Sequence, residues 1–299
     1  MRRWVMMPRS NCSPAPGSFV RVDGTVLHVV QDGAGPTVLV TSGLACAWFD
    51  WDTTVPLLAP HGRVVRFDRP GLGLSAPDPR PPTLYGETER LRAVAEAVGA
   101  PGPYVIVAHS YAGFHAEAFA RLHPEHTAGV VLVDASAEPA ARARPAPAAR
   151  LALARAIGGT FRLTGLSRPV GPALRRLAVR GFSRRGRDAG DPEWTRRSYA
   201  SGRFLTAAFT ENTTYLDQAA ELLRLRDRTV FPDVPLRVLA AGGGREPDAV
   251  KARWLDRQRT LAALAPRGRC DVVEDAAHML MIDRPDAVAA AVRDVLAEA

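Results

Sequence analysis

The residues from 103 to 113 have the pattern expected of a nucleophile held at a sharp turn. Their sequence is Pro-Tyr-Val-Ile-Val-Ala-His-Ser-Tyr-Ala-Gly, in which the apolar run over 104–107 predicts a buried strand. The alanine-rich amphipathic stretch over 114–122 predicts a helix directly after the turn. A serine at the apex of a strand, turn and helix is the arrangement of a nucleophile elbow, so Ser110 is the candidate nucleophile. The alternative is a structural role for Ser110 as the N-cap of the helix.

Two alanines beside this turn depart from the usual elbow pattern. That pattern has glycine two residues before and two residues after the nucleophile, because the strand and the helix must approach closely. Here these positions hold Ala108 and Ala112, and Gly113 follows one residue later. Two methyl groups must therefore fit beside the turn.

A serine hydroxyl becomes a good nucleophile when a base takes its proton, and that base needs a third group to fix its tautomer. Of the seven histidines, only His278 follows a late predicted strand in a loop of small residues, so it is the candidate base. The others are expected to be structural or to face solvent: His28 in a hairpin strand, His61 in a loop, His109 pointing away from the nucleophile, His115 in a helix, and His123 and His126 at a helix end.

Buried strands and amphipathic helices alternate along most of the chain. A hairpin is expected over 19–30, turning at Asp23-Gly24. Further strands are expected at 37–41, 63–67, 129–133, 235–241 and 269–273, and helices at 84–98, 249–264 and 285–297. This alternation predicts an α/β fold with a mostly parallel sheet. Reactive side chains collect beyond the carboxyl ends of such strands, where this chain has Leu44, Asp68, Ser110, Asp134, the loop 242–248 and His278.

The segment 138–231 has a different composition, with alternating Ala, Arg and Pro and no strand pattern. It predicts a helical insertion into a core made of 19–137 and 232–299, while residues 1–18 are expected to be a disordered tail. The arginines of the insertion are expected to form a solvated face, with a carboxylate-bearing substrate or an acidic partner as alternatives. Its aromatic residues are expected mainly to fill the interior of the insertion, with pocket lining as the alternative: Phe161, Phe182, Trp194, Tyr199, Phe204, Phe209 and Tyr215.

Composition excludes several classes of protein. The net charge is +8, but Lys251 is the only lysine among 39 basic residues, and the arginines are scattered, so we expect no nucleic-acid partner. Three distant cysteines form neither a disulfide framework nor a metal-ligand spacing. No apolar run has the length of a membrane span or a signal peptide, which predicts a cytoplasmic protein without a membrane partner. The sequence indicates a small-molecule substrate and gives no oligomeric state.

Four motifs in the chain resemble those of the α/β-hydrolase superfamily. They are Thr41-Ser-Gly-Leu44 with Phe49-Asp-Trp51, Phe67-Asp-Arg-Pro-Gly-Leu-Gly-Leu-Ser75, Val131-Leu-Val-Asp-Ala-Ser136, and Ala276-Ala-His-Met-Leu-Met-Ile-Asp-Arg-Pro285. The second and the last are far more specific than the elbow alone. The resemblance extends from about residue 19 to the end of the chain except for the insertion, and implies an α/β-hydrolase fold with a helical cap.

The same resemblance implies the remaining site residues. The oxyanion hole would be made by the backbone N–H groups of Leu44 and Tyr111. Many relatives have histidine where this chain has Ser42, so the oxyanion loop must be braced differently. The triad acid lies either in the loop after strand 235–241 or directly after the preceding strand. We favour Asp134 at the second position, with Glu246 and Asp248, both at an unusual offset in the first, as alternatives. Asp68 is expected to shape the 69–75 loop.

Together these residues predict a serine hydrolase that cleaves a small ester, with an amide or thioester as alternative substrates. Ser110 would form an acyl-enzyme, with His278 as base, Asp134 as its partner, and no metal or organic cofactor. A serine at the elbow argues against haloalkane dehalogenase and epoxide hydrolase chemistry, which resembling enzymes run through an aspartyl ester. A cofactor-free lyase or perhydrolase, or a binding protein with little turnover, are the alternatives. Trp48 and Phe49 are expected to contact the substrate.

Overall fold

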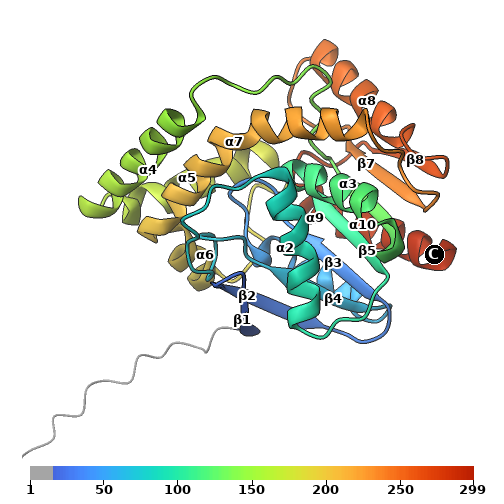
Figure 1. Cartoon of the computed structure of the whole chain (residues 1–299), viewed down its shortest axis with the longest axis horizontal. Helices are drawn as coiled ribbons and strands as arrows, with labels where there is room; N and C mark the ends of the chain where they lie inside the picture. Colours follow the sequence, from blue (N-terminus) through green and yellow to red (C-terminus); the bar gives the residue numbers. More distant parts are fainter. Residues whose placement is uncertain (1–15) are drawn as a thin grey trace, which may run out of the picture.

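The computed structural model describes residues 16–299. Most of the predicted tail, residues 1–15, lies outside this range, and the first strand already begins at Ser18. The chain forms a sheet with helices on both faces and a group of helices beside one end (Figure 1). None of the helices in the described range is long and apolar enough to cross a bilayer.

The central sheet has eight strands in the order β1-β2-β4-β3-β5-β6-β7-β8. Their bounds are β1 Ser18–Val22, β2 Thr25–Asp32, β3 Thr37–Thr41, β4 Arg63–Phe67, β5 Tyr104–His109, β6 Thr127–Val133, β7 Leu236–Ala241 and β8 Gly268–Val273. The hairpin strand β2 is antiparallel to both β1 and β4, and every other neighbouring pair is parallel. The prediction of a mostly parallel α/β-hydrolase sheet is confirmed, so the carboxyl ends of β3 to β8 share one edge.

Alternate residues of the strands bury into two separate cores. In β5, for example, Ile106 belongs to one core while Val105 and Val107 belong to the other. The helices that cover the Ile106 face are α2 Leu84–Ala97, α3 Gly113–Leu122 and α8 Asp248–Ala262. Those on the opposite face are α1 Val55–Leu58, α9 Leu280–Asp283 and α10 Pro285–Glu298. Because both faces are covered, the central strands read as continuous apolar runs in the sequence.

Between β6 and β7 the chain forms four α-helices. They are α4 Pro147–Leu163, α5 Ser167–Phe182, α6 Pro192–Tyr199 and α7 Gly202–Arg226. Helix α4 packs along α7, and α5 and α6 also contact each other and α7. Figure 1 shows these helices gathered at one end of the molecule, and we call this group the cap. Three short 3₁₀ segments, Trp48–Trp51, Ser110–Ala112 and Pro124–His126, complete the described elements.

The Asp68 carboxylate organises the loop after β4, as the sequence predicts. It accepts hydrogen bonds from the N–H groups of Trp48 and Leu74, and it lies 2.9 Å from the Nδ1 atom of His28. Gly73 has a φ of +46°, and a Cβ atom there would lie 2.1 Å from Asp68. The loop therefore needs glycine at this position for both conformation and space.

The glycine of the nucleophile turn is shifted by one residue. Ala108 and Ala112 are fully buried, and their methyl groups fit into the core on the α2–α3 face. The close approach occurs instead at Gly113, where a Cβ atom would lie 2.6 Å from the Cβ of Ala135. The two alanines are thus compatible with the turn because the contact between α3 and the end of β6 falls on Gly113.

We expect the substitution Gly113→Ala to destabilise the fold by about 1–3 kcal/mol, because the added methyl group overpacks this contact. The matched control is Gly181→Ala in α5, where an added Cβ meets no atom within 4 Å. Helix propensity makes this control neutral or stabilising by up to about 1 kcal/mol. Urea unfolding measures both, and equal stabilities of the two variants would contradict the account of the turn.

Candidate active site

Ser110 stands in a strained conformation directly after β5. Its φ is +52°, in the left-handed region that residues other than glycine seldom adopt. The backbone holds this conformation, since the Ser110 carbonyl accepts a hydrogen bond of 3.0 Å from the Ser136 N–H. The turn presents the hydroxyl group at the carboxyl edge of the sheet, as a nucleophile elbow requires.

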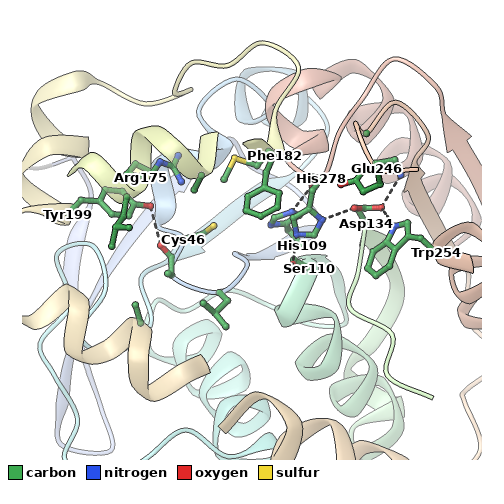
Figure 2. Close-up of a pocket in the computed structure, with 18 of the residues that line it drawn as sticks. Cys46, His109, Ser110, Asp134, Arg175, Phe182, Tyr199, Glu246, Trp254 and His278 are labelled. Carbon is green, nitrogen blue, oxygen red and sulfur yellow. Dashed lines mark hydrogen bonds and ion pairs between the residues drawn. The ribbon is translucent and has the colours of Figure 1, made fainter. Parts of the chain in front are cut away.

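The structure brings the predicted serine, histidine and aspartate into one hydrogen-bonded chain (Figure 2). The Nε2 atom of His278 lies 2.9 Å from Ser110 Oγ, and its Nδ1 atom lies 2.6 Å from Asp134 Oδ2. Since the carboxylate accepts, Nδ1 carries the hydrogen and Nε2 is free to take the serine proton. The sequence separations are 168 and 144 residues, so only the sheet topology makes these contacts.

The Asp134 carboxylate is fixed from two further directions. Its Oδ1 atom accepts hydrogen bonds from the Ala241 N–H (2.9 Å) and from the indole N–H of Trp254 (2.7 Å). The side chain is almost fully buried, and the residue has a φ of +44° directly after β6. Oδ1 is thus held by Ala241 and Trp254, and Oδ2 orients His278.

The two alternative acids do not take this place. Among the described residues, Asp134 provides the only carboxylate hydrogen-bonded to His278. Glu246 lies in the wall of the same cavity, and Asp248 is exposed at the start of α8. The loop after β7 therefore places neither of them at the imidazole.

His109 lies beside His278, contrary to the expectation that it points away from the site. The two ring centroids are 4.8 Å apart, and His109 Nε2 donates a hydrogen bond of 2.9 Å to the His278 carbonyl oxygen. Burial lowers the pKa of His109 well below its usual range, and the neighbouring His278 lowers it further. Gly43 makes room for it, because a Cβ there would lie 2.6 Å from His109 Nδ1. A neutral His109 thus supports the loop of the candidate base.

The loop 42–47 after β3 carries Leu44 into the cavity wall next to Ser110. Arg69 braces this loop by donating to the carbonyl oxygens of Ser42 and Gly43, the second at 2.7 Å. Glu211 of α7 accepts a hydrogen bond of 2.9 Å from the Ala45 N–H. The loop is thus braced by Arg69 and by Glu211 of the cap, two contacts that sequence reasoning did not find.

Arg69 and Glu211 also bind each other, with 2.6 Å between Nε and Oε1. Both side chains are more than nine-tenths buried. Burial alone would lower the pKa of Arg69, but the Glu211 charge outweighs it and raises the pKa. Removing one partner of such a pair leaves an unpaired buried charge. The pair therefore fixes α7 of the cap to the loop 42–47.

The Tyr111 side chain is buried behind the turn and belongs to a polar network. Its hydroxyl accepts a hydrogen bond of 2.6 Å from the amide of Gln218, whose carbonyl oxygen accepts one from His115 Nε2. Burial raises the pKa of the Tyr111 phenol well above its usual range. The network positions the residue whose backbone N–H is the second predicted oxyanion donor.

Trp48 and Phe49 lie behind the site, not in its wall. They begin a 3₁₀ turn that faces inward, and both are buried in a cluster with Tyr199 and Phe204. A Cβ at Gly190 would lie 2.7 Å from the Cβ of Phe49, so the chain between α5 and α6 covers this ring. The expectation that Trp48 and Phe49 contact the substrate is therefore not met by their placement.

A cavity of about 600 Å³ opens above Ser110 between the sheet edge and the cap. Its wall is mostly apolar, and four of the seven cap aromatic residues contribute to it. The apolar lining includes Leu174, Ala178, Phe182, Phe204, Leu205, Ala208, Phe209, Val250, Trp254 and Met279. The Phe182 ring lies beside the His278 ring (Figure 2), with 5.7 Å between the two ring centroids.

Arg175 and Cys46 also line this cavity. Arg175 is buried against Asp50 and Asp188. Burial, reinforced by Asp50, raises the pKa of the Cys46 thiol, so Cys46 is not an activated nucleophile. Within the described residues no group of three or more His, Cys, Asp or Glu side chains is arranged to hold a metal ion.

Comparison with known proteins identifies the family. The sequence profile of the alpha/beta hydrolase family matches residues 27–291. The chain belongs to the alpha/beta hydrolase family. The chain is 28% identical over 223 residues to an uncharacterised protein of Schizosaccharomyces pombe, covering 75% of this chain and 39% of the yeast protein. It is 35% identical over 116 residues to epoxide hydrolase B of Mycobacterium tuberculosis, covering 36% and 32%.

Solved structures show the same fold. A thermophilic esterase from Thermogutta terrifontis superimposes with a TM-score of 0.66 at 22% identity, covering 95% of this chain and 98% of the esterase. The curated relatives are longer than the matched region, since this chain spans less than two fifths of each of the two named above. An esterase and an epoxide hydrolase are thus both among the proteins that this chain resembles.

Buried His115 predicts a pH dependence of stability. Burial, with a smaller contribution from Arg69, lowers its pKa from 6.5 to about 4. Below about pH 6.5 the unfolded chain takes up a proton that the folded chain refuses, so stability falls toward pH 4 by up to about 1.4 kcal/mol per pH unit. We expect His115→Gln to lose less stability than wild type between about pH 7 and pH 5. Urea unfolding at both pH values measures this, and identical losses would disprove the prediction.

Proposed function

We propose that this protein is a serine hydrolase that cleaves esters of apolar acids or alcohols through an acyl-enzyme on Ser110. The observation that carries the proposal is the continuous hydrogen-bonded chain from Ser110 Oγ through His278 to Asp134. It opens into a cavity large enough for a small organic substrate. Ser110, Asp134 and His278 follow three different strands, and their side chains meet at one edge of the sheet with the base between the nucleophile and the acid.

In the first step His278 Nε2 takes the Ser110 proton while Oγ attacks the ester carbonyl carbon. The tetrahedral intermediate collapses to an acyl-serine, and the imidazolium gives its proton to the leaving alcohol. A water molecule then enters, His278 removes its proton, and the attack on the acyl-serine releases the acid and restores Ser110. Asp134 keeps the hydrogen of His278 on Nδ1 and stabilises the imidazolium in both halves of the reaction.

The oxyanion would be held by the N–H groups of Leu44 and Tyr111. Leu44 lies in the cavity wall beside Ser110, and Tyr111 follows the nucleophile directly, which supports this assignment. Each such donor contributes about 3–4 kcal/mol to lowering the barrier. Arg69 and Glu211 fix the first donor's loop, so the hole is formed before the substrate arrives.

The choice of an ester over an epoxide rests on the elbow residue. Epoxide opening in resembling enzymes needs a carboxylate nucleophile that forms an alkyl ester, and this chain has Ser110 there. A serine alkoxide is suited to an acyl carbon, where the oxyanion is stabilised as charge develops. The apolar wall favours a substrate with several exposed carbon atoms over a short polar one.

The test is hydrolysis of a p-nitrophenyl ester series from acetate to octanoate by purified protein. We expect kcat/KM to rise with acyl length, since each added methylene buried in the apolar wall contributes about 0.8 kcal/mol. Ser110→Ala and His278→Ala should each lower kcat by about 10⁴-fold or more, and Asp134→Asn by about 10⁴-fold. KM should change far less than kcat, because the substitutions remove transition-state interactions.

Asp248→Asn is the control for the acid, since this exposed carboxylate lies outside the cavity wall. It should leave kcat within about twofold of wild type. Retained activity in Asp134→Asn together with lost activity in Asp248→Asn would overturn the assignment of the acid. A folded wild type without turnover on the whole series would overturn the proposed reaction.

A further inference from the structure

A second cavity, of about 350 Å³, lies on the other side of α7 from the Ser110 cavity. It is bounded by the loop 69–82, by α2 of the core and by α4 and α7 of the cap. The two cavities share no lining residue, because they lie against different faces of α7. Leu205 and Ala208 line the first cavity, and Thr206 and Thr210 line the second. The second cavity is thus a separate space at the junction of cap and core.

Six arginines and three carboxylates line this second cavity. The arginines are Arg69, Arg80, Arg90, Arg155, Arg162 and Arg203, and the carboxylates are Asp78, Glu87 and Glu211. Every carboxylate is already engaged: Asp78 with Arg80 and Arg90, Glu87 with Arg90, and Glu211 with Arg69. Three positive charges therefore have no matching negative charge in the wall.

Two guanidinium N–H groups in the wall are buried without an acceptor in the described part of the chain. They are Nη1 of Arg90, whose side chain is only 8% exposed, and Nε of Arg203. Burial lowers the pKa of Arg203, and the charge of Asp68 offsets this only in part. A buried donor of a charged group without a partner is costly, and an anion in the cavity would supply the missing acceptors.

The cap contributes two further features that suit an anion. Arg162 of α4 makes no hydrogen bond to any described residue, so its guanidinium is free to bind a ligand. Gly202 and Arg203 in the wall form the first turn of the 25-residue helix α7, whose N-terminus carries a partial positive charge. Arginine forks bind two oxygens of a phosphate at once and match its double charge better than a single carboxylate.

We propose that this second cavity binds a small phosphate-bearing anion between the cap and the core. The volume accommodates a phosphate group with a short organic chain attached. The cavity shares no lining residue with the Ser110 cavity, although Arg69 and Glu211 of its wall also brace the loop 42–47. Free phosphate and an organic phosphate monoester share this chemistry, and the experiment compares them with the phosphodiester of a lipid headgroup.

The experiment is isothermal titration calorimetry of the full chain with inorganic phosphate, glycerol 3-phosphate and succinate, and co-sedimentation with phosphatidylglycerol vesicles. We expect saturable binding of the two phosphates with one site per chain, tighter than binding of succinate. Ser110→Ala protein should bind equally well, which separates this result from the outcome of the hydrolysis assay.

Two variants should remove the binding without disturbing the fold. Arg155→Gln with Arg162→Gln removes two exposed arginines of α4 and should weaken phosphate binding by about tenfold or more. Gly159→Glu places a carboxylate in the cavity from a position where an added Cβ meets nothing within 4 Å, and should abolish binding. The matched controls lie on α5, outside the cavity: Arg176→Gln with Arg180→Gln, and Gly181→Glu.

The proposal requires that both controls bind phosphate within about twofold of wild type. Absence of saturable binding of either phosphate to wild type would overturn it. So would an equal loss of affinity in the control variants, because it would show a general effect of the cap's charge. Binding to vesicles without binding of the free phosphates, or tighter binding of succinate, would reject a phosphate site in this cavity.

Discussion

The carboxylate of Asp134 connects four parts of the chain at one point. One of its oxygens accepts from the backbone at the end of β7 and from an indole of α8, and the other accepts from the imidazole after β8. Asp134 itself directly follows β6 in a left-handed conformation that only surrounding contacts can maintain. The position of His278 relative to Ser110 depends on this arrangement. The strain is located where the proposed chemistry needs rigidity, and the sheet on either side compensates for it.

The cap is part of the site and not only a cover. Glu211 reaches from α7 to the loop of the first predicted oxyanion donor, and Arg69 joins both. At the other end of the cap, the carbonyl oxygen of Phe182 accepts a hydrogen bond of 2.7 Å from the Met279 N–H, next to His278. The cap is thus tied to the loop 42–47 and to the loop that carries His278. A rearrangement of its helices would move both loops together.

Much of the core could be predicted from the sequence because its signals are local. The strands at 37–41 and 63–67 were predicted with their observed bounds, since buried parallel strands are short apolar runs between turn residues. Asp134 was favoured because it directly follows such a run, and the structure places it at His278. The family and fold followed from motifs that local geometry constrains, such as the glycine of the Asp68 loop.

Contacts across the insertion could not be predicted, because no local pattern encodes them. Glu211 is 142 residues from Arg69 and resembles any other acidic residue on an amphipathic helix. Trp48 and Phe49 were placed next to the substrate from their sequence position, but the turn direction and the segment around Gly190 bury them. The arginines of α4 were expected to form a solvated face. Their spacing does not reveal that the loop 69–82 closes a cavity against them.

The most direct test of the central claim is intact-mass and peptide analysis after incubation with a fluorophosphonate, which labels an activated serine covalently. The account predicts a single adduct on the peptide that contains Ser110, no adduct in Ser110→Ala, and much slower labelling in Asp134→Asn. The adduct should form without added metal or cofactor. An adduct on another residue, or a folded wild type that stays unlabelled, would contradict the claim that Ser110 is an activated nucleophile.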